Sequence, residues 1–388
     1  MDLRFTGTQQ EFRTEVRGWL VENTPTTPLP PMDTPEGFEL HRGWERVLHE
    51  AGWSVVAWPE AYGGRGADLV EWLIFEEEYY RSGAPGRVNT NGISLLGPTL
   101  FAYGTDAQKD RFLPPMASGA EIWAQAWSEP NAGSDLASIT TRGVRDGEWF
   151  VLDGQKTWCS RGAWADWLFC IVRTDPTSER HRGLSYLLVP ADSEGLERRP
   201  VGRLDGEPAF AELFFDGCRV HESNLLGDEG QGWNVAMATT SSERGLNLRA
   251  PGRFLATADR LTGLYRELVE AGTADEGLLD EVVLAWIGAQ AYRWQTYRTA
   301  ARLMGGGELG SASSMMKVFW SELDVELHAT ALRLLGDRGE LVAAAPDAVD
   351  GGSWMSGYLF ALSGPIYAGT NEIQRNIIAE RVLGLPRK

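Results

Sequence analysis

The sequence predicts an α+β protein of several domains, in the order helical, β, helical. Three observations predict this order. Apolar residues recur at helical spacing in the first 120 residues, short β-prone runs fill the middle, and long helical segments occupy the remainder. At roughly 150 residues per domain, 388 residues allow two or three domains. We therefore expect domains at residues 1–121, 122–228 and 229–388.

The first domain is expected to be helical. Thr8 and Glu11 predict a capping box at the start of a helix. The apolar residues that follow lie on one face of this helix: Phe12, Val16, Trp19 and Leu20. A Pro-rich stretch, 25–35, and a Gly/Pro-dense loop, 58–64, are expected to be connectors. A second helix is expected near 69–80.

The middle domain, about residues 122–228, is expected to be an antiparallel β domain. Its β-prone runs are 149–152, 167–172, 184–189 and 213–215. Four Asp-Gly pairs occur in this part of the chain: Asp146-Gly147, Asp153-Gly154, Asp205-Gly206 and Asp216-Gly217. Asp-Gly between β-prone runs indicates a hairpin, because both central residues of the favoured turn need positive φ. Each pair is therefore expected to be a hairpin turn.

The last domain is expected to be a helical bundle. After the Gly-rich loop 227–232 the helical period returns in four long segments: 251–271, 277–304, 312–336 and 371–383. These predict a bundle of four or five helices. The single G-x-G-x-x-G match, Gly305–Gly310, follows a helical segment rather than a strand, and no G-x-x-x-x-G-K occurs. Neither a Rossmann nor a P-loop nucleotide site is indicated.

Composition excludes several classes of function. The net charge is −18 and Lys and Arg are scattered, so a nucleic-acid partner is not expected. No apolar run reaches about 18 residues, so we expect no membrane-spanning helix. The first residues lack the apolar core of a secretory signal. Five His without an H-E-x-x-H motif argue against a metal site.

The cysteines indicate a reducing compartment. The chain has an odd number of cysteines, Cys159, Cys170 and Cys218, and no C-x-x-C pair. Neither a disulfide framework nor a zinc site is therefore expected. Core packing is the ordinary role for such residues. We expect a cytoplasmic protein.

Four segments contain residue types suited to ligand chemistry: Trp127–Asp135, Gly154–Ser160, Ser241–Gly245 and Tyr367–Arg375. A Gly-Ser turn offers backbone N–H groups and a hydroxyl. A Trp two residues before a hydroxyl can cover a planar ring while the hydroxyl bonds the ring edge. Each segment also has an ordinary structural interpretation: a turn, a core Trp, a solvated Glu-Arg pair and a helix start.

Together with Tyr103–Lys109, these segments occur in an order and spacing that closely resembles the acyl-CoA dehydrogenase family. The resemblance runs from about Phe12 to the C-terminus. It implies a helical N-terminal domain, a middle β-barrel and a C-terminal four-helix bundle, with FAD between the β domain and the bundle. It also implies oxidation of an acyl-CoA thioester.

The resemblance also assigns residues. Positions implied to bind FAD are Gln125, Trp127, Ser128, Ser134, Trp158, Cys159, Ser160, Thr370 and Glu372. Trp158 and Ser160 match residues that pack on the flavin and bond it, and Thr370 and Glu372 match positions near the adenosine. Ser134 and Arg244 are implied to meet the substrate.

The sequence departs from the family at the usual catalytic base. Most members carry a glutamate at the position of Ala368, and alanine accepts no proton. The branch that resembles long-chain and isovaleryl-CoA dehydrogenases carries the base in a Glu-Arg pair, which here is Glu243-Arg244. Glu243 is thus implied to remove the α-proton while flavin N5 takes the β-hydride, with the Ala368 N–H as an oxyanion donor.

A second departure concerns assembly. The family's Arg-x-x-Phe-Gly segment, which grips the FAD of a neighbouring subunit, is absent between Val269 and Asp280, and the later Gly-rich loop is altered to Leu335–Gly339. This resembles the subclass in bacteria that shorten sterol side chains, where two different chains assemble. Either other residues such as Arg338 substitute in a homo-oligomer, or a second acyl-CoA dehydrogenase-like chain completes the site.

Three functions therefore remain open. The first is an FAD-dependent acyl-CoA dehydrogenase that forms a trans-2-enoyl-CoA and passes electrons to an electron-transfer flavoprotein. The second is a catalytically silent or half-site subunit of a hetero-oligomer. The third is a related flavin oxidation of a non-CoA substrate, such as a nitroalkane or a carrier-bound acyl group.

Overall fold

The computed structural model describes residues 4–244, 250–343 and 345–386; the side chains of residues 241–244 and of Ala312 lie outside this description. The chain divides into two compact units. One, the helical unit, comprises Met1–Thr24, Asp68–Ala84 and Arg244–Lys388. The other, the β unit, comprises Pro25–Ala67 and Pro85–Glu243. The first unit thus joins segments from both ends of the chain.

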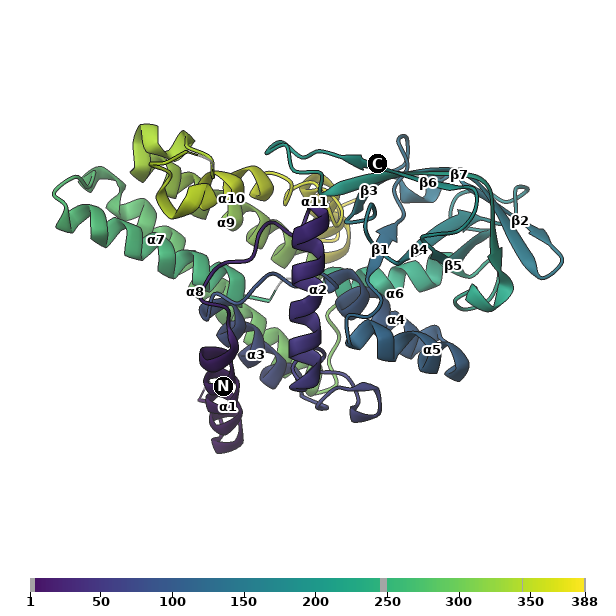
Figure 1. The fold of residues 1–388 in the computed structure, drawn as a ribbon, viewed down its shortest axis with the longest axis horizontal. Coiled ribbons are helices and arrows are strands. Elements are labelled where there is room, and N and C mark those ends of the chain that lie inside the picture. Colours follow the sequence, from purple (N-terminus) through teal and green to yellow (C-terminus); the bar gives the residue numbers. More distant parts are fainter. Residues whose placement is uncertain (1–3, 245–249, 344, 387–388) are drawn as a thin grey trace. The chain divides into compact units, whose positions relative to one another are not determined.

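The helical unit contains all four helical segments predicted after residue 250. Its helices are α1 (Gly7–Asn23), α3 (Leu69–Arg81), α7 (Gly252–Glu270), α8 (Leu279–Met304), α9 (Ala312–Leu335), α10 (Ser353–Ala361) and α11 (Asn371–Ile377), which continues as a π-helical turn (Ile378–Val382). Helix α10 was not anticipated from the sequence. Helices α7, α8 and α9 pack against one another, as Figure 1 shows.

Two adjacent buried carboxylates hold α3 against its neighbours in the helical unit. Glu77 accepts hydrogen bonds from Arg13 of α1 (3.0 Å) and, through both oxygens, from Arg293 of α8 (2.6 and 2.9 Å). Glu78 is bound by Arg17 through both oxygens, at 2.9 and 3.0 Å. Buried charges must be paired to be tolerated, so these ion pairs specify how α1 and α8 meet α3.

The start of α1 differs from the prediction. The capping box is formed by Thr6 and Gln9: the Thr6 hydroxyl accepts from Gln9 N (3.2 Å), and the Gln9 side chain accepts from Thr6 N (3.0 Å). Thr8 lies inside the helix. Both pairs fit the S/T-x-x-E/Q pattern, and the earlier one is used because the helix begins at Gly7.

The β unit contains the seven-stranded sheet. Its strands are β1 (Trp123–Ala126), β2 (Arg142–Asp146), β3 (Trp149–Ser160), β4 (Trp167–Arg173), β5 (Leu184–Pro190), β6 (Leu196–Val201) and β7 (Phe210–His221). The order is β1-β4-β2-β3-β7-β6, with β5 paired to β4. Most pairs are antiparallel as predicted, but β1 and β2 run parallel to β4. The unit's helices are α2 (Pro35–Glu50), α4 (Gly97–Tyr103), α5 (Asp106–Ala117) and α6 (Gly232–Arg244).

Two of the four predicted hairpin turns are bulges inside strands. Asp146-Gly147 joins β2 to β3 and Asp205-Gly206 lies between β6 and β7, as predicted. Asp153-Gly154 and Asp216-Gly217 instead lie within β3 and β7, where the pairing register shifts, and Gly217 N donates to the Asp153 side chain at 3.0 Å. The prediction was wrong there because a bulge, like a turn, uses a glycine at positive φ.

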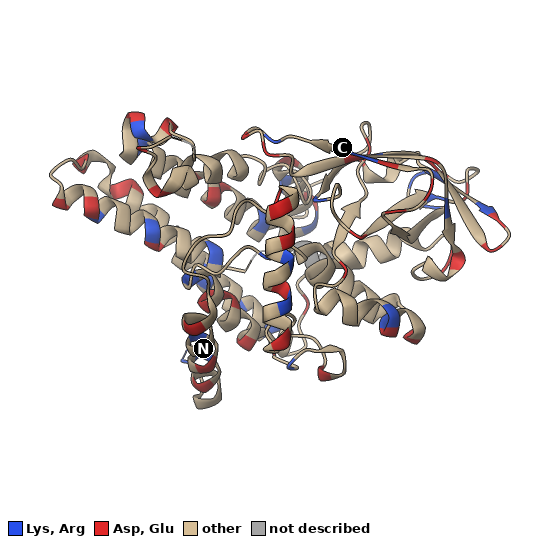
Figure 2. Cartoon of the chain, viewed as in Figure 1, with Lys and Arg blue, Asp and Glu red and all other residues tan. Residues whose placement is uncertain are grey.

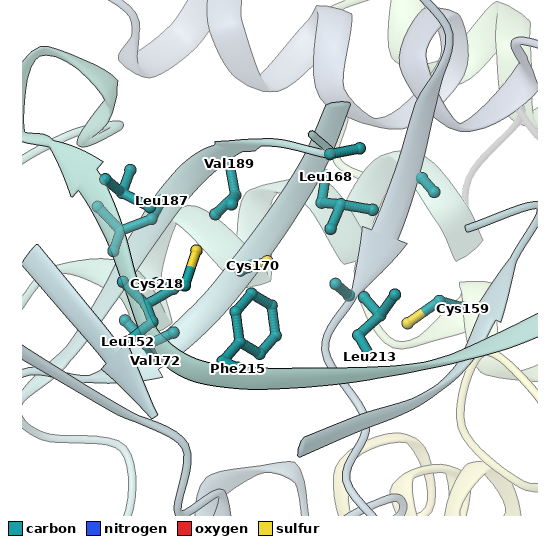
Figure 3. Packing of buried hydrophobic residues seen from close by; sticks show 14 of the residues in the cluster. Leu152, Cys159, Leu168, Cys170, Val172, Leu187, Val189, Leu213, Phe215 and Cys218 are labelled. Carbon is teal, nitrogen blue, oxygen red and sulfur yellow. The ribbon is translucent and has the colours of Figure 1, made fainter. Parts of the chain in front are cut away.

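The β unit has an apolar core that contains all three cysteines (Figure 3). Their thiols are free and buried. Burial raises the pKa of Cys159 to about 12 and that of Cys218 to about 11, so both remain protonated near neutral pH. This confirms core packing as their role. Among the described helices, none has the length and apolar character needed to span a bilayer.

Candidate functional site

A buried ion pair joins the two candidate segments of the β unit. Lys156, on β3, is fully buried, and its ammonium donates to Glu129 Oε1 (2.9 Å) and to the Trp127 carbonyl (3.1 Å). The backbone adds a parallel connection, because Thr157 N donates to the Ser128 carbonyl at 2.9 Å. Segments 127–135 and 154–160 are therefore held side by side.

The Glu129 carboxylate has partners for both of its oxygens. Oε2 accepts from the Thr140 backbone and hydroxyl (2.7 and 2.9 Å), and Oε1 accepts from Thr141 N (2.9 Å) as well as from Lys156. Burial alone raises the pKa of Glu129, but the Lys156 ammonium and the hydrogen bonds from Thr141, Lys156 and Thr140 outweigh it and lower the pKa to about 2. The carboxylate is therefore ionised at neutral pH.

Trp158 lies next to this ion pair and points outward. Its side chain is 61% exposed, and its backbone has φ +59° at a bulge where the β3–β7 register shifts. The Phe210 ring packs edge-on against the indole, with the two ring centroids 5.7 Å apart. A non-glycine residue in the left-handed region costs about 1 kcal/mol or more, and such strain clusters at binding sites. Ser160 is half-buried two residues further on, paired with Phe210.

The other residues implied to bind FAD in the β unit differ in accessibility. Gln125 and Ser128 are half-buried near the end of β1. The Trp127 side chain is 5% exposed and packs on Phe169 and Tyr186. The Cys159 side chain is buried in the β core. A ligand at the surface reaches Cys159 through the backbone and not through the thiol.

Ser134 occupies an exposed turn beside a surface ion pair. Asp135, its neighbour in sequence, accepts from Arg180 at 2.7 Å, and Arg180 has φ +55°. Arg180 also contributes its carbonyl to a set of backbone oxygens bound by Arg173. The turn that presents the Ser134 hydroxyl is thus tied to the β4–β5 connection.

Helix α6 carries the predicted base at its C-terminal end. Its middle is anchored in the β unit by Thr239, whose hydroxyl lies 2.9 Å from that of Thr99 and donates to the Val235 carbonyl (3.0 Å). Glu243 and Arg244 are the last two residues of α6. Their side chains lie outside the described part of the structure, so the assignment of Glu243 as base stays a prediction.

In the helical unit, the segment before α11 forms a rigid turn around Ala368. Ala368 has φ +56° and Gly369 has φ +80°. Gln374 donates to the carbonyls of both residues at 3.2 Å, and Asn371 N donates to the Pro365 carbonyl at 2.8 Å. In the described part of the chain, no acceptor meets the Ala368 N–H. The turn therefore presents the Ala368 N–H as a backbone donor, and the contacts of the Gln374 side chain hold the turn in place.

The remaining predicted residues of this unit lie at the start of α11. The Thr370 hydroxyl caps the helix by accepting from Ile373 N at 3.3 Å. Glu372 is exposed in the first turn, and hydrogen bonds from its own backbone N–H and from Thr370 lower the pKa of its carboxyl. Buried Lys317 of α9 donates to the Asn371 side chain at 2.8 Å and so fixes the helix start.

These features suit a planar, uncharged heteroaromatic ring. The β unit offers an exposed indole face, hydroxyls at Ser128 and Ser160, and the half-buried amide of Gln125. Neutral donors and acceptors of this kind match the edge of an isoalloxazine, while the indole matches its face. The residues present therefore fit a flavin. Among the described residues, no group of three His, Cys, Asp or Glu side chains could hold a metal ion.

Sequence reasoning missed the residues that support the site. Glu129, Lys156 and Gln374 lie inside segments that were singled out but had no assigned role, and Lys317 lies outside those segments. One signal was available: a lysine in a strand core needs an anionic partner, and Glu129 lies in the neighbouring motif. No comparable signal pointed to Gln374.

The chain matches three family domains in order. Residues 6–120 match the acyl-CoA dehydrogenase N-terminal domain, residues 124–218 the middle domain and residues 230–383 the C-terminal domain. Among curated proteins, acyl-CoA dehydrogenase IpdE1 of Mycobacterium tuberculosis (strain ATCC 25618 / H37Rv) is 41% identical over 98% of both chains. FadE26 of the same organism is 32% identical over 100% of this chain and 99% of its own.

Solved structures show the same likeness. The steroid acyl-CoA dehydrogenase Tcur3481-Tcur3483 matches with a TM-score of 0.89 and 28% identity, covering all of both chains. The ChsE4-ChsE5 complex from Mycobacterium tuberculosis matches with a TM-score of 0.85 and 30% identity, again over 100% of each chain. Both names describe assemblies of two components.

The Glu129–Lys156 pair predicts how stability depends on pH. Because the pKa of Glu129 falls from 4.5 to about 2 on folding, its stabilisation is fully present above the unfolded value and is lost as pH falls through the folded value. A shift of this size corresponds to about 3 kcal/mol. Between pH 6 and pH 3 the free energy of unfolding should fall more steeply in the wild type than in Glu129→Gln, measured by chemical denaturation. Parallel slopes would contradict the assignment.

Proposed function

This chain belongs to the acyl-CoA dehydrogenase family of FAD-dependent oxidoreductases, and we propose that it oxidises an acyl-CoA thioester to a trans-2-enoyl-CoA with Glu243 as the α-proton base. The observation that carries this proposal is the turn at Ala368. Its side chain accepts no proton, yet its backbone N–H is free of acceptors in the described residues. If the Ala368 position supplies only a backbone donor, the base that removes the α-proton must come from another residue.

The proposed division of labour follows from charge. Removing the α-proton leaves an enolate-like oxyanion on the thioester, which preorganised N–H donors stabilise. The Ala368 turn holds such a donor rigidly, since Gln374 fixes both adjacent carbonyls. Glu243 receives the proton, and an apolar acyl chain beside it would raise its pKa toward neutrality. FAD, when bound, accepts the β-hydrogen as a hydride.

The β unit is proposed to bind and orient the flavin. Trp158 is proposed to cover the ring, and Ser160, Ser128 and Gln125 to bond its edge. In the helical unit, Thr370 and Glu372 are proposed to lie toward the adenosine. The ion pair between Lys156 and Glu129 keeps the two binding segments in register. Ser134 and Arg244 are proposed to meet the thioester substrate.

The substrate, acceptor and compartment belong to the same proposal. Relatives named as steroid acyl-CoA dehydrogenases favour a bulky, steroid-derived acyl-CoA. An electron-transfer flavoprotein is proposed as the acceptor, by family resemblance. A cytoplasmic location is supported by the three free cysteines in the β core. We also propose the domain limits 1–121, 122–228 and 229–388.

A half-site subunit is the second candidate. Between α7 and α8 the chain has no arginine at the place of the family's Arg-x-x-Phe-Gly segment, and two relatives are named as two-component assemblies. In a homo-oligomer Arg338 is the proposed substitute; it is exposed and bonds only weakly to the Asp347 carbonyl, at 3.5 Å. The ratio of FAD to subunit in protein expressed alone separates the two candidates. A ratio near one supports the self-sufficient form, and a low ratio rescued by a second chain supports the half-site.

Glu243→Gln should lower the rate of flavin reduction by an acyl-CoA roughly a thousandfold, because removing a general base typically costs about 10²–10⁴. FAD content and thioester binding should not change, since the side chain keeps its size. The rate is measured by anaerobic stopped-flow bleaching with a panel of acyl-CoA thioesters, steroid-derived ones included. Glu270→Gln, at the end of α7, is the matched control. A normal rate in Glu243→Gln would remove this residue from the mechanism.

Trp158→Ala should release FAD without unfolding the protein, because the side chain is mostly exposed and contributes little to the core. The readouts are the FAD-to-protein ratio after gel filtration and the gain in melting temperature on adding FAD. Trp149→Ala is the control, since Trp149 lies on the same strand and is 38% exposed. Equal FAD retention by both variants would mean that Trp158 has no role at the cofactor.

A further inference from the structure

Arg253, in the first turn of α7, is a partly exposed cation of the helical unit. Its Nη2 donates to the carboxylate of Asp324 on α9, whose side chain is only 1% exposed. A buried carboxylate needs a cation beside it, so Arg253 is the counter-ion of Asp324. The Arg253 side chain nevertheless remains 23% exposed. Figure 2 shows acidic and basic residues interspersed along α7, so Arg253 is not part of a continuous basic face.

The ion pair leaves most of the Arg253 fork unused. Among the described residues, Nη2 has Asp324 as its acceptor, while Nε and Nη1 have none. Arg293, on α8 of the same unit, shows the contrast, because its Nε and Nη2 both donate to Glu77. An arginine that only joins helices can use its fork in that way. Arg253 therefore has donors left for a further acceptor.

An aromatic cluster links Arg253 to the Ala368 turn. Phe254, the next residue of α7, packs on Trp320 of α9 with the ring centroids 6.2 Å apart. Trp320 also packs on Tyr367, with 5.9 Å between the centroids, and Tyr367 directly precedes Ala368. Arg253 and the proposed oxyanion donor thus lie at the two ends of one aromatic cluster.

Electrostatic interactions also indicate that Tyr367 is close to Arg253. Burial alone would lower the pKa of Arg253, but the charge of Asp324, followed by Tyr367 and Tyr80, outweighs burial and raises the pKa. Such interactions weaken with distance, so both phenols lie near the guanidinium. Tyr367 is half-buried and Tyr80 is exposed. An acyl group whose thioester is held at the Ala368 N–H can therefore reach Arg253.

The charges around Arg253 favour a neutral ligand atom. Arg253 and Asp324 together have no net charge. His328, one turn after Asp324, adds none, because burial lowers the pKa of its imidazole and keeps it neutral near pH 7. Its Nδ1 donates to the Asp324 carbonyl at 2.8 Å. A ligand carboxylate would bring uncompensated negative charge next to Asp324, whereas a ketone or hydroxyl oxygen would bring none.

We propose that Arg253 determines substrate specificity by binding a neutral acceptor oxygen, a ketone or a hydroxyl, on the acyl group beyond its reacting carbons. Nε and Nη1 donate to this oxygen, and Asp324 holds the guanidinium in position and disfavours a carboxylate. A wholly apolar acyl group leaves these donors without an acceptor, which weakens its binding. This inference rests on the proposed function and deepens it by naming a feature of the substrate.

The first test compares thioesters that differ only in this oxygen. The probes are octanoyl-CoA and its 5-oxo, 6-oxo and 7-oxo derivatives. Binding is measured by isothermal titration calorimetry in the FAD-loaded Glu243→Gln variant, which avoids turnover. At least one oxo thioester should bind about tenfold more tightly than octanoyl-CoA, because a charged donor gains an acceptor.

The outcomes of this test separate the two proposals. Equal affinity for all four thioesters overturns the role of Arg253 and leaves the proposed function standing. No binding of any thioester, together with no flavin bleaching in the wild type, overturns the proposed function and this inference with it.

The second test removes both charges together, so that neither is left alone. Arg253→Met combined with Asp324→Asn should reduce the affinity for the preferred oxo thioester to that for octanoyl-CoA, with circular dichroism unaltered. Arg260→Met, two turns further along α7, is the matched control and should keep the preference. A preference that survives in the folded double variant overturns the assignment of Arg253.

The third test changes the charge selectivity. Asp324→Asn keeps the size of the side chain but leaves Arg253 with an unbalanced positive charge. The mono-CoA thioester of octanedioic acid, which ends in a free carboxylate, should then bind about tenfold more tightly than it does to the parent protein with Asp324. Unchanged binding of this thioester would contradict the role of Asp324 in disfavouring a carboxylate.

Discussion

A lysine ammonium buried inside a β unit is stable only beside an anion, and this requirement organises the candidate site. Lys156 is fully buried on β3, and the anion it needs is supplied by Glu129, 27 positions earlier in the chain. The pair therefore fixes the segment after β1 against the bulge of β3. Removing either partner leaves an uncompensated buried charge, which is costlier than losing both. The outward position of Trp158 depends on that arrangement, since the indole follows Lys156 by two residues in the same bulge.

The backbone is strained at two residues where ligand contacts are expected, one a tryptophan and the other an alanine. Trp158 and Ala368 both have positive φ, which glycine adopts more readily. In each case neighbouring polar contacts hold the conformation. Thr157 N donates to the Ser128 carbonyl next to Trp158, and the Gln374 side chain donates to the carbonyls of Ala368 and Gly369. Strain persists only where the surroundings over-determine it. An indole face and an N–H donor are thereby presented in fixed directions before any ligand binds.

The helical unit shows how one helix serves two faces. On its inner side α8 is held by the Arg293–Glu77 pair and by buried Ala289 and Tyr292. On its outer side the large apolar residues are left exposed and the charges at the two ends are of opposite sign. An amphipathic helix needs one apolar stripe to pack in a bundle.

The sequence by itself determined the helical–β–helical order, the family and the positions of most long helices, because periodicity and short motifs are local properties. Helix α3 was predicted at 69–80 and found at Leu69–Arg81 for that reason. Only the tertiary structure decided that Asp153-Gly154 and Asp216-Gly217 are bulges, since a glycine at positive φ serves a turn or a bulge equally and strand pairing selects between them. It also decided that Thr6 caps α1, that Glu129 is the counter-ion of Lys156 and that Gln374 holds the Ala368 turn. Each of these depends on which residues meet in space, and spacing along the chain does not encode that.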